Sequence, residues 1–340
     1  MKRLSGLLPT DRHTLRLLLP PVGAMLTIAV LLIGLTTGAS SVSAKDILQA
    51  LFSPHRDTHA ANILYLVRLP RMLACILCGG ALAVSGLLIQ TVLHTPLASP
   101  GIIGVNAGSG FAVVLVASLF PAAFLPRIIA AFLGALCAVM LVYAIARKTG
   151  ASKLTIILAG VAVSGLLTAL TDALVTINPA AVMDRSAFSM GGFSGVGLRQ
   201  IVPGIPIVLC SVAAALLLSK HLEVLTMGDE VAASLGVRVE LARFLSLFIA
   251  ALLAACAVSI GGLIGFVGLI APHMARILFK TGFLKLIAFS FWFGGMLMLI
   301  CDLTARVLFR PYEISTGIVL SCIGAPFFLF LLLKRRREHL

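Results

Sequence analysis

Residues 243–272 read RFLSLFIAALLAACAVSIGGLIGFVGLIAP and contain one charged side chain, that of Arg243. Residues 243–261 can cross a bilayer, because a spanning helix needs about 20 apolar residues. Residues 262–272 are too short to cross alone as a regular helix, are rich in glycine and end at Pro272. A membrane tolerates such an interrupted segment only where protein buries it or where it lines a cavity. The stretch therefore predicts a membrane-spanning protein that contains broken helices.

The rest of the chain has the same character. Of its 340 residues, 60% are hydrophobic and 11% are charged, which leaves too few polar side chains to cover a soluble domain. We predict an all-α, polytopic membrane protein that forms a single transmembrane domain over residues 1–340. Ten spans are expected, at residues 15–37, 70–93, 101–119, 127–146, 153–177, 201–218, 243–261, 262–272, 284–305 and 314–333.

A second interruption lies in the first half of the chain, at residues 94–104 (HTPLASPGIIG). One interrupted segment in each half is what an inverted-repeat transporter shows. The prediction is therefore a transporter built from two related halves.

The basic residues indicate the orientation of the chain. The formal net charge is +14, but Lys and Arg sit mainly at the ends of the expected spans, where they decide topology. With the N-terminus inside, 17 of the 26 Lys and Arg residues are cytoplasmic. This bias predicts that both termini are cytoplasmic. No basic surface interleaved with aromatic residues is present, so we expect no nucleic-acid partner.

The most informative polar stretch is the expected cytoplasmic segment 220–243. Within it, residues 227–236 are predicted to form a short amphipathic helix, with Asp229 and Glu230 in its first turn and Gly236 at its end. Two interpretations are open: docking into a groove on a soluble partner, or lying flat on the membrane surface. A membrane-surface helix is rich in Lys and Arg on its polar face. The acidic face here favours docking.

Charged residues inside the expected spans are scarce. Asp172 in the fifth span is the best candidate for a buried polar contact, and intramembrane charge is usually functional. Three threonines surround it, so a hydrogen bond to a neighbouring helix is an equally good interpretation. Asp302 is expected to pair with Arg306, four residues away. No chain of acids that could relay protons crosses the membrane.

Nucleotide and metal motifs are also missing from the sequence. No G-x-x-x-x-G-K-[ST] motif is present, so energy for transport would have to come from a partner. Cys75 and Cys78 form a C-x-x-C on an apolar helix without a second pair, which favours packing over metal binding. We expect no cofactor and no metal site in this chain.

Several motifs occur in an order typical of one family. Glu230, Ala232, Ala233 and Gly236 resemble the EAA-x-x-x-G signature of permeases that work with ATP-binding-cassette (ABC) ATPases. The other motifs are RLPR at 68–71, HTPLASPGIIG at 94–104, LAG at 158–160, MGG at 190–192, GFVGLIAPHMAR at 265–276, DLTAR at 302–306 and GAP at 324–326. With this ordered set the chain resembles, from about residue 60 to residue 333, the FecCD family of permeases for iron–siderophores, haem and cobalamin.

The resemblance implies a set of partners. They are a second permease copy or a paralogous permease, two cytoplasmic ATPases that bind ATP and Mg, and an external or periplasmic substrate-binding protein. It also implies a bacterial or archaeal inner membrane, and a translocation path lined by spans five and ten.

The resemblance also implies roles for individual residues. Contact with the ATPase would fall to Met227, Gly228, Asp229, Glu230, Ala232, Ala233 and Gly236. The binding protein would dock on Arg68, Arg71 and Arg306. Simple snorkelling anchors are the alternative for these arginines. The cytoplasmic constriction would lie near Leu97 and Ser152, with Asp172 along the path.

The function that follows is import of a metal chelate, with a ferric siderophore first and haem or cobalamin next. The chain would be a transport subunit and not an enzyme. The main alternative is a secondary transporter driven by an ion gradient. An intramembrane enzyme is a further alternative, but it would need a catalytic constellation inside the membrane, and the sequence contains none.

Overall fold

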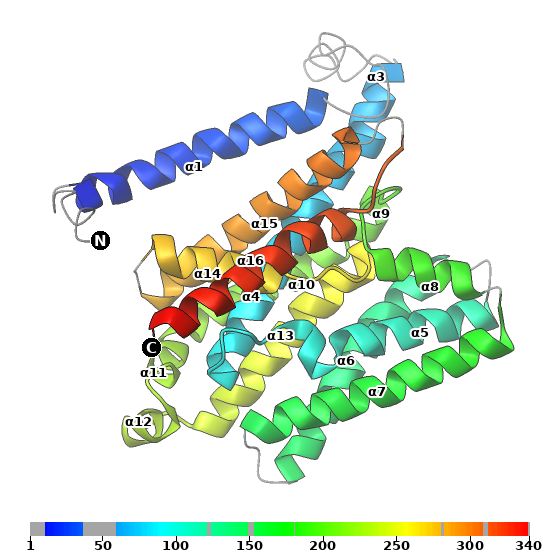
Figure 1. Ribbon diagram of the computed structural model, residues 1–340. Coiled ribbons are helices and arrows are strands. Elements are labelled where there is room, and N and C mark those ends of the chain that lie inside the picture. Colours follow the sequence, from blue (N-terminus) through cyan, green and yellow to red (C-terminus); the bar gives the residue numbers. More distant parts are fainter. Residues whose placement is uncertain are drawn as a thin grey trace.

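The computed structural model describes residues 11–36, 59–120, 124–148, 153–179, 181–279, 282–308 and 312–338, which contain helices and no strand (Figure 1). The first half contains α1 (Asp11–Thr36), α3 (His59–Asn62), the π-helix η1 (Ile63–Arg68), α4 (Leu69–Leu93), the 3-10 helix η2 (Pro100–Ile103), α5 (Val105–Leu119), α6 (Phe124–Lys148) and α7 (Lys153–Ile177). The second half contains α8 (Ala181–Met190), α9 (Leu198–Ile201), α10 (Gly204–Leu217), α11 (Ser219–Leu225), α12 (Asp229–Ser234), α13 (Val239–Gly261), α14 (Val267–Leu278), α15 (Phe283–Val307) and α16 (Thr316–Glu338).

The predicted all-α, polytopic membrane fold is confirmed. Six segments are long and apolar enough to cross a membrane, and four shorter apolar helices accompany them in the described part of the chain. Each of the ten expected spans overlaps one of these segments. In α1, α5, α14 and α16 the apolar stretch counted among the described residues is shorter than a full span, so the count of ten crossings stays a prediction.

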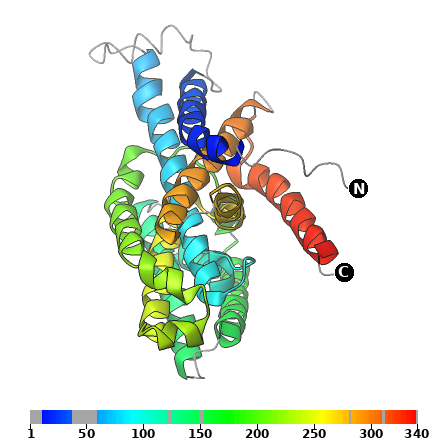
Figure 2. The same ribbon diagram turned by 90° about the vertical axis from the view of Figure 1, so that its left-hand side faces the viewer.

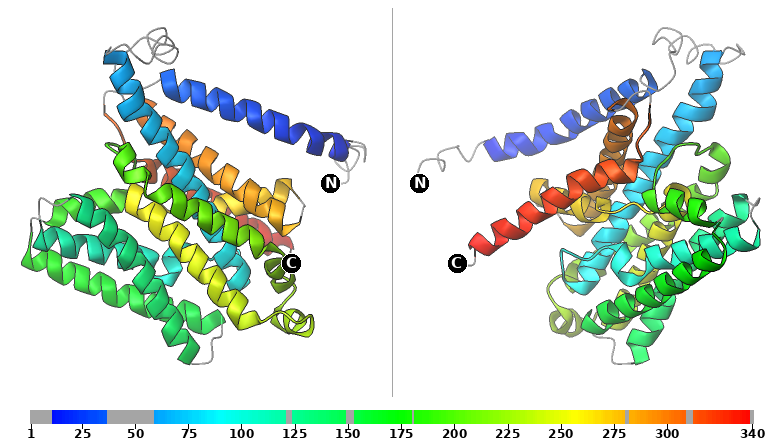
Figure 3. Two further views of the ribbon diagram at one scale, coloured as in Figure 1. Left: turned by 180° about the vertical axis from the view of Figure 1, so that it is seen from behind. Right: turned by 45° about the vertical axis from the view of Figure 1, so that its right-hand side comes forward.

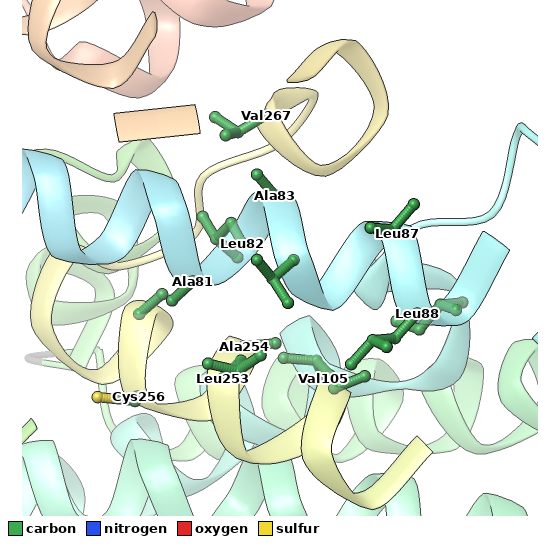
Figure 4. Close-up of a cluster of buried hydrophobic side chains, with 14 of the residues drawn as sticks. Ala81, Leu82, Ala83, Leu87, Leu88, Val105, Leu253, Ala254, Cys256 and Val267 are labelled. Carbon is green, nitrogen blue, oxygen red and sulfur yellow. The ribbon is translucent and has the colours of Figure 1, made fainter. Parts of the chain in front are cut away.

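Helix α4 lies at the centre of the subunit. The segment that contains it, Ala60–Leu93, is 83% buried over its most apolar stretch, and α4 packs against α13, α14 and α15. Figure 4 shows Ala81, Leu82 and Leu88 of α4 beside Leu253 and Ala254 of α13 and Val105 of α5. With no hydrophobic force to hold helices together in lipid, this close packing provides most of the cohesion.

Small residues allow α4 to approach its neighbours. Gly79 faces Gly294 of α15, and a Cβ on either residue would collide with the carbonyl oxygen of the other. A Cβ on Gly86 would collide with the carbonyl oxygen of Gly268 in α14, and one on Gly268 would press on the carbonyl oxygen of Leu82. The backbones therefore approach more closely than larger side chains would allow.

The second span begins earlier than the sequence predicted. We expected it to start at Pro70, yet helix is continuous from His59 through α3, η1 and α4. The reason is the π-helical turn of η1, in which the Leu69 N–H bonds to the carbonyl of Leu64, five residues back. This wider turn lies directly before Pro70, which has no N–H to donate.

The eighth span was also predicted wrongly. We expected it to cover 262–272 and to stop at Pro272, but α14 begins at Val267 and continues through Pro272 to Leu278. Pro272 cannot donate to the carbonyl of Gly268, four residues back. The side-chain Nε2 of Gln90 donates to that carbonyl instead, at 2.8 Å, and Arg276 Nη1 in turn donates to Gln90 Oε1 at 2.7 Å. Tertiary contacts therefore satisfy the group that the proline leaves free.

Helices α5, α6, α7 and α8 form a group on one side of α4 and α13 (Figures 1 and 3). The most apolar stretches of α6 and α7 are each only 28% buried in this subunit. Figure 2 shows that the C-terminal end of α16 lies away from the other helices. These outer helices therefore present large surfaces that the subunit itself does not cover.

Candidate functional site

The short helix expected between spans six and seven is α12, and glycines in a left-handed or similar conformation flank it. Gly228 has φ 114° and Gly236 has φ 81°, values that L side chains rarely adopt. At its end the Val237 N–H bonds to the carbonyl of Ala232 and the Gly236 N–H bonds to that of Ala233. These two hydrogen bonds form a Schellman motif, which fixes where the helix ends.

Asp229 ties α12 to two spanning helices. Its Oδ2 lies 3.1 Å from Lys153 Nζ at the start of α7 and 3.0 Å from Arg243 Nη2 near the start of α13. Partial burial raises the pKa of Asp229, but the hydrogen bond from Lys153 and the charge of Arg243 outweigh this effect and leave the pKa below its ordinary value. The carboxylate therefore stays ionised, and it can hold both cations, over the whole physiological pH range.

His94, directly after α4, connects the end of that helix to the end of α11. It has φ 52°, a left-handed value for a residue that is not glycine. Its Nε2 lies 2.8 Å from the carbonyl oxygen of Leu225, the last residue of α11. The expected break at 94–104 thus ends α4 where it meets the segment that carries α12.

An exposed apolar stripe runs along the outside of this helix. Val231 lies within α12, Met227 precedes Gly228 and Leu235 follows the last helical residue; their exposed fractions are 43%, 64% and 63%, and together they form the apolar stripe. Ala232, the next residue after Val231, is fully buried against the subunit. The ion pairs therefore fix α12 by its inner face and leave its apolar outer face uncovered by this chain.

At the opposite end of the subunit, Asp302 of α15 lies at the centre of a buried ion network. Its carboxylate accepts two hydrogen bonds from Arg71 Nε at 3.1 Å and one from the Thr316 hydroxyl at 2.9 Å. Arg306 Nη2 lies 3.0 Å from Asp302 Oδ2, which confirms the expected i,i+4 pair. Arg71 Nη1 also lies 2.8 Å from Glu313 Oε2. One carboxylate thus connects α4, α15 and the first residue of α16.

All three arginines that were expected to face an external partner are buried in this subunit. Arg71 and Arg306 bind Asp302, and Arg68 donates from Nη1 to the carbonyl oxygen of Leu35 in α1. The structure therefore gives these side chains internal partners. Their role in docking stays a prediction.

Comparison with known proteins decides the family. The profile of the FecCD transport family matches residues 26–334. The chain belongs to the FecCD transport family. The match covers both clusters described above, so α12 and the Asp302 network lie within the shared domain.

Individual FecCD relatives match over nearly their whole length. The achromobactin transport system permease protein CbrC of Dickeya dadantii is 37% identical over 92% of this chain and 90% of its own. The Fe(3+)-citrate import system permease protein YfmD of Bacillus subtilis is 35% identical over 96% of this chain and 97% of its own. A solved structure of an inward-facing metal-chelate type ABC transporter superimposes with a TM-score of 0.81, at 30% identity, over 96% of this chain and 100% of that one.

The structure corrects the expected environment of Asp172 in this FecCD chain. We expected a buried contact, but the Asp172 side chain is more than half exposed and pairs with Arg185 of α8 at 2.5 Å. Of the nearby threonines, Thr176 donates to the backbone carbonyl of Asp172 and not to its carboxylate. The reason is that α7 lies at the edge of the subunit, where few neighbours can cover its side chains.

The expected constriction is described only in part. Leu97 lies in the turn between α4 and η2 and is exposed. Ser152 lies outside the described residues, next to the first residue of α7. Neither position tests the predicted constriction, which stays a prediction for this FecCD chain.

Sequence reasoning missed several contacts at the Asp302 end of this FecCD chain. Glu313 was not singled out, and Arg71 was not expected to bind Asp302, because 231 residues separate the two. Ser315 was missed as well, although its hydroxyl donates to the carbonyl of Met190 at 2.8 Å and so joins the start of α16 to the end of α8. The available signal was the presence of two acids close to basic residues at the ends of expected spans.

Proposed function

We propose that this chain is the membrane-spanning permease subunit of an ABC importer that carries a metal chelate, with a ferric siderophore as its cargo. The FecCD membership supports the transport role. A relative named for Fe(3+)-citrate import, and the similarity to a metal-chelate type ABC transporter, support an iron chelate as cargo. ATP and Mg would be bound by the partner ATPase.

The observation that carries this proposal is the outer face of α12. The apolar stripe of Met227, Val231 and Leu235 projects from the same end of the subunit as the basic start of α7. Exposed apolar side chains on and beside a short helix suit a groove on another protein. We propose that this groove belongs to the cytoplasmic ATPase and that two ATPases serve two permease copies.

Coupling follows from the ion pairs of Asp229. A movement of the ATPase that displaces α12 is transmitted to α7 through Lys153 and to α13 through Arg243, because one carboxylate holds both cations. Helix α7 is mostly uncovered in this subunit, so it is free to line a path between two copies. The gate near Leu97 and Ser152 would lie at the cytoplasmic end of this path.

The proposal is tested by reconstituting the permease with its ATPase and binding protein in liposomes and measuring uptake of radioactive iron. We expect uptake with ATP and a fall to background when the catalytic residues of the ATPase are disabled. The rival, an ion-gradient transporter, predicts uptake that follows an imposed proton or sodium gradient without ATP. Gradient-driven uptake by the permease alone would refute the importer.

The external binding protein is proposed to dock at the outer end of α4 and α15. Its acidic residues would use Arg71, together with Arg68 and Arg306, because a guanidinium fork suits a carboxylate. In the subunit alone, Arg71 is shared between the buried Asp302 and the partly exposed Glu313. We propose that a carboxylate of the binding protein replaces Glu313 during docking, while Asp302 keeps Arg71 in place.

The proposed exchange predicts that Glu313→Gln increases the affinity of the permease for the binding protein. Removing this competing carboxylate should tighten docking of the binding protein about twofold to fivefold at low salt, the range that a partly exposed ion pair covers. Surface interferometry on nanodisc-embedded permease measures the affinity. Asp172→Asn is the matched control, because it also removes an acid near the outer side but leaves Arg71 unchanged. An unchanged or weaker affinity for Glu313→Gln would contradict the exchange.

A further inference from the structure

A cavity of about 350 Å³ opens between α5, α6, α9 and α13, beside the loop 191–197 that follows α8. Such a volume is at the lower end of the range for small-molecule sites. Neither α7 nor any Asp or Glu contributes to its described lining. The cavity is therefore distinct from the path proposed along α7. Within that lining the ionisable side chain is Arg127, so the cavity is positively charged.

The cavity lies at the level of the lipid headgroups. Helix α6 places Arg127 about 32 Å along its axis from Lys148, and α13 places Ser259 about 30 Å from Val239, at 1.5 Å per residue. The hydrocarbon core of a bilayer is about 30 Å thick. Because the charge bias puts Lys148 and Val239 on the cytoplasmic side, Arg127 and Ser259 reach the outer edge of that core.

Apolar side chains close to the cavity are uncovered. Leu125 lies two residues before Arg127 on α6, and Leu198 and Val202 lie two residues before and after Gln200 at α9. All three apolar side chains are exposed in the subunit, and such a surface marks contact with a membrane or a partner. A phospholipid suits both features at once, because its acyl chains cover apolar side chains while its headgroup reaches a basic pocket between helices.

The polar lining suits a phosphate group. A guanidinium such as that of Arg127 has five N–H donors in a planar fork, which matches phosphate oxygens. The Gln200 amide and the Ser194 hydroxyl provide neutral donors in the same lining. The Ser259 hydroxyl is already engaged, since it donates to the carbonyl of Cys256 at 2.8 Å. Phe188, also in the lining, provides apolar contact for the glycerol end of a lipid.

We propose that this cavity binds the phosphate of an anionic phospholipid in the outer leaflet of the membrane. Arg127 pairs with the phosphate, and Gln200 and Ser194 donate hydrogen bonds to its oxygens. With no carboxylate in the described lining, the ammonium of a zwitterionic headgroup has no partner there. The site therefore prefers phosphatidylglycerol to phosphatidylethanolamine. It adds a lipid ligand to the proposed transport function and does not depend on the identity of the cargo.

Native mass spectrometry of the full-length permease in detergent, titrated with each lipid, measures these affinities. We expect phosphatidylglycerol to bind about threefold to tenfold more tightly than phosphatidylethanolamine. Arg127→Gln removes the cation and should weaken phosphatidylglycerol binding about tenfold. Arg199→Gln is the matched control, because Arg199 is exposed on α9 directly before Gln200 but lies outside the cavity lining. The affinity of this control should equal that of wild type.

Gln200→Glu tests the cavity without removing Arg127. The substitution keeps the size of the side chain and adds a carboxylate, so it should weaken phosphatidylglycerol binding about threefold or more. The same carboxylate offers a partner to the ammonium of phosphatidylethanolamine. The preference between the two lipids should therefore fall or reverse. A preference equal to that of wild type would show that the headgroup lies elsewhere.

Three other results would overturn the proposal. Equal losses in Arg127→Gln and Arg199→Gln would indicate general attraction of lipid to a basic surface. Calorimetry with glycerol 3-phosphate tests a free phosphate ester, and binding as tight as that of the lipid would assign the cavity to a soluble anion. If Arg127→Gln lost affinity for the external binding protein and kept its affinity for phosphatidylglycerol, the cavity would belong to a docking surface. ATP-dependent iron uptake by wild type alongside any of these results would leave the proposed function standing.

Discussion

Asp302→Ala is expected to lower the free energy of unfolding by about 3–5 kcal/mol, the usual cost of removing one partner from a buried ion pair. Asp302 is fully buried and is shared by Arg71, Arg306 and the Thr316 hydroxyl. Without it Arg306 loses its counter-ion in the described network, and Arg71 keeps its ion pair with Glu313. Two cations would then be buried with one partly exposed acid to balance them.

Unfolding of the purified permease in mixed micelles, followed by circular dichroism, measures the loss. Thr316→Val is the matched control, because it removes one hydrogen bond to the same carboxylate and leaves every charge in place. It should cost about 0.5–1.5 kcal/mol. If Asp302→Ala were as stable as Thr316→Val, the network would not hold the outer ends of α4, α15 and α16 together.

The second large effect is expected on the cytoplasmic side. The double substitution Val231→Glu and Leu235→Glu should weaken association with the ATPase by about 100-fold or more, since central apolar anchors often contribute 2 kcal/mol or more each. Both side chains are exposed in the subunit, so the fold itself should be unaffected. Co-purification and ATP-dependent iron uptake should be lost together.

His221→Glu is the control for added negative charge on this side. His221 is exposed on α11, the helix before α12, and is not a member of the apolar stripe. It should leave the complex intact. A double variant that still co-purifies with the ATPase, and still imports iron, would show that α12 is not the contact.

Apolar runs and small residues made much of the fold predictable. Each expected span overlaps an apolar helix, because 20 apolar residues have no stable place except inside the bilayer. The α12 helix was foreseen from its acidic first turn and from Gly236, and both are local signals. The wrong boundaries lie at Pro70 and Pro272. There a π-helical turn and the Gln90 side chain satisfy groups that local rules leave unpaired.

The candidate sites were predictable only where their contacts are short in sequence. The Asp302–Arg306 pair spans one helical turn, and it was expected. Arg71–Asp302 joins residues 231 apart, and Lys153–Asp229 joins two helices that do not follow each other in the chain. The pattern of apolar residues along the sequence does not predict such pairs, because they depend on which helices pack together.

The amino-acid sequence by itself determined that this chain is a helical membrane protein of the FecCD type and that a short acidic helix follows the sixth span. Only the tertiary structure decided that Arg68, Arg71 and Arg306 are buried within the subunit and that Asp172 is exposed beside Arg185. The physical reason is that lipid selects apolar helices one segment at a time, through hydropathy that each segment carries alone. The partner of a charged group is instead selected by the packing of helices distant in the chain, such as α4 on α15 through Gly79 and Gly294.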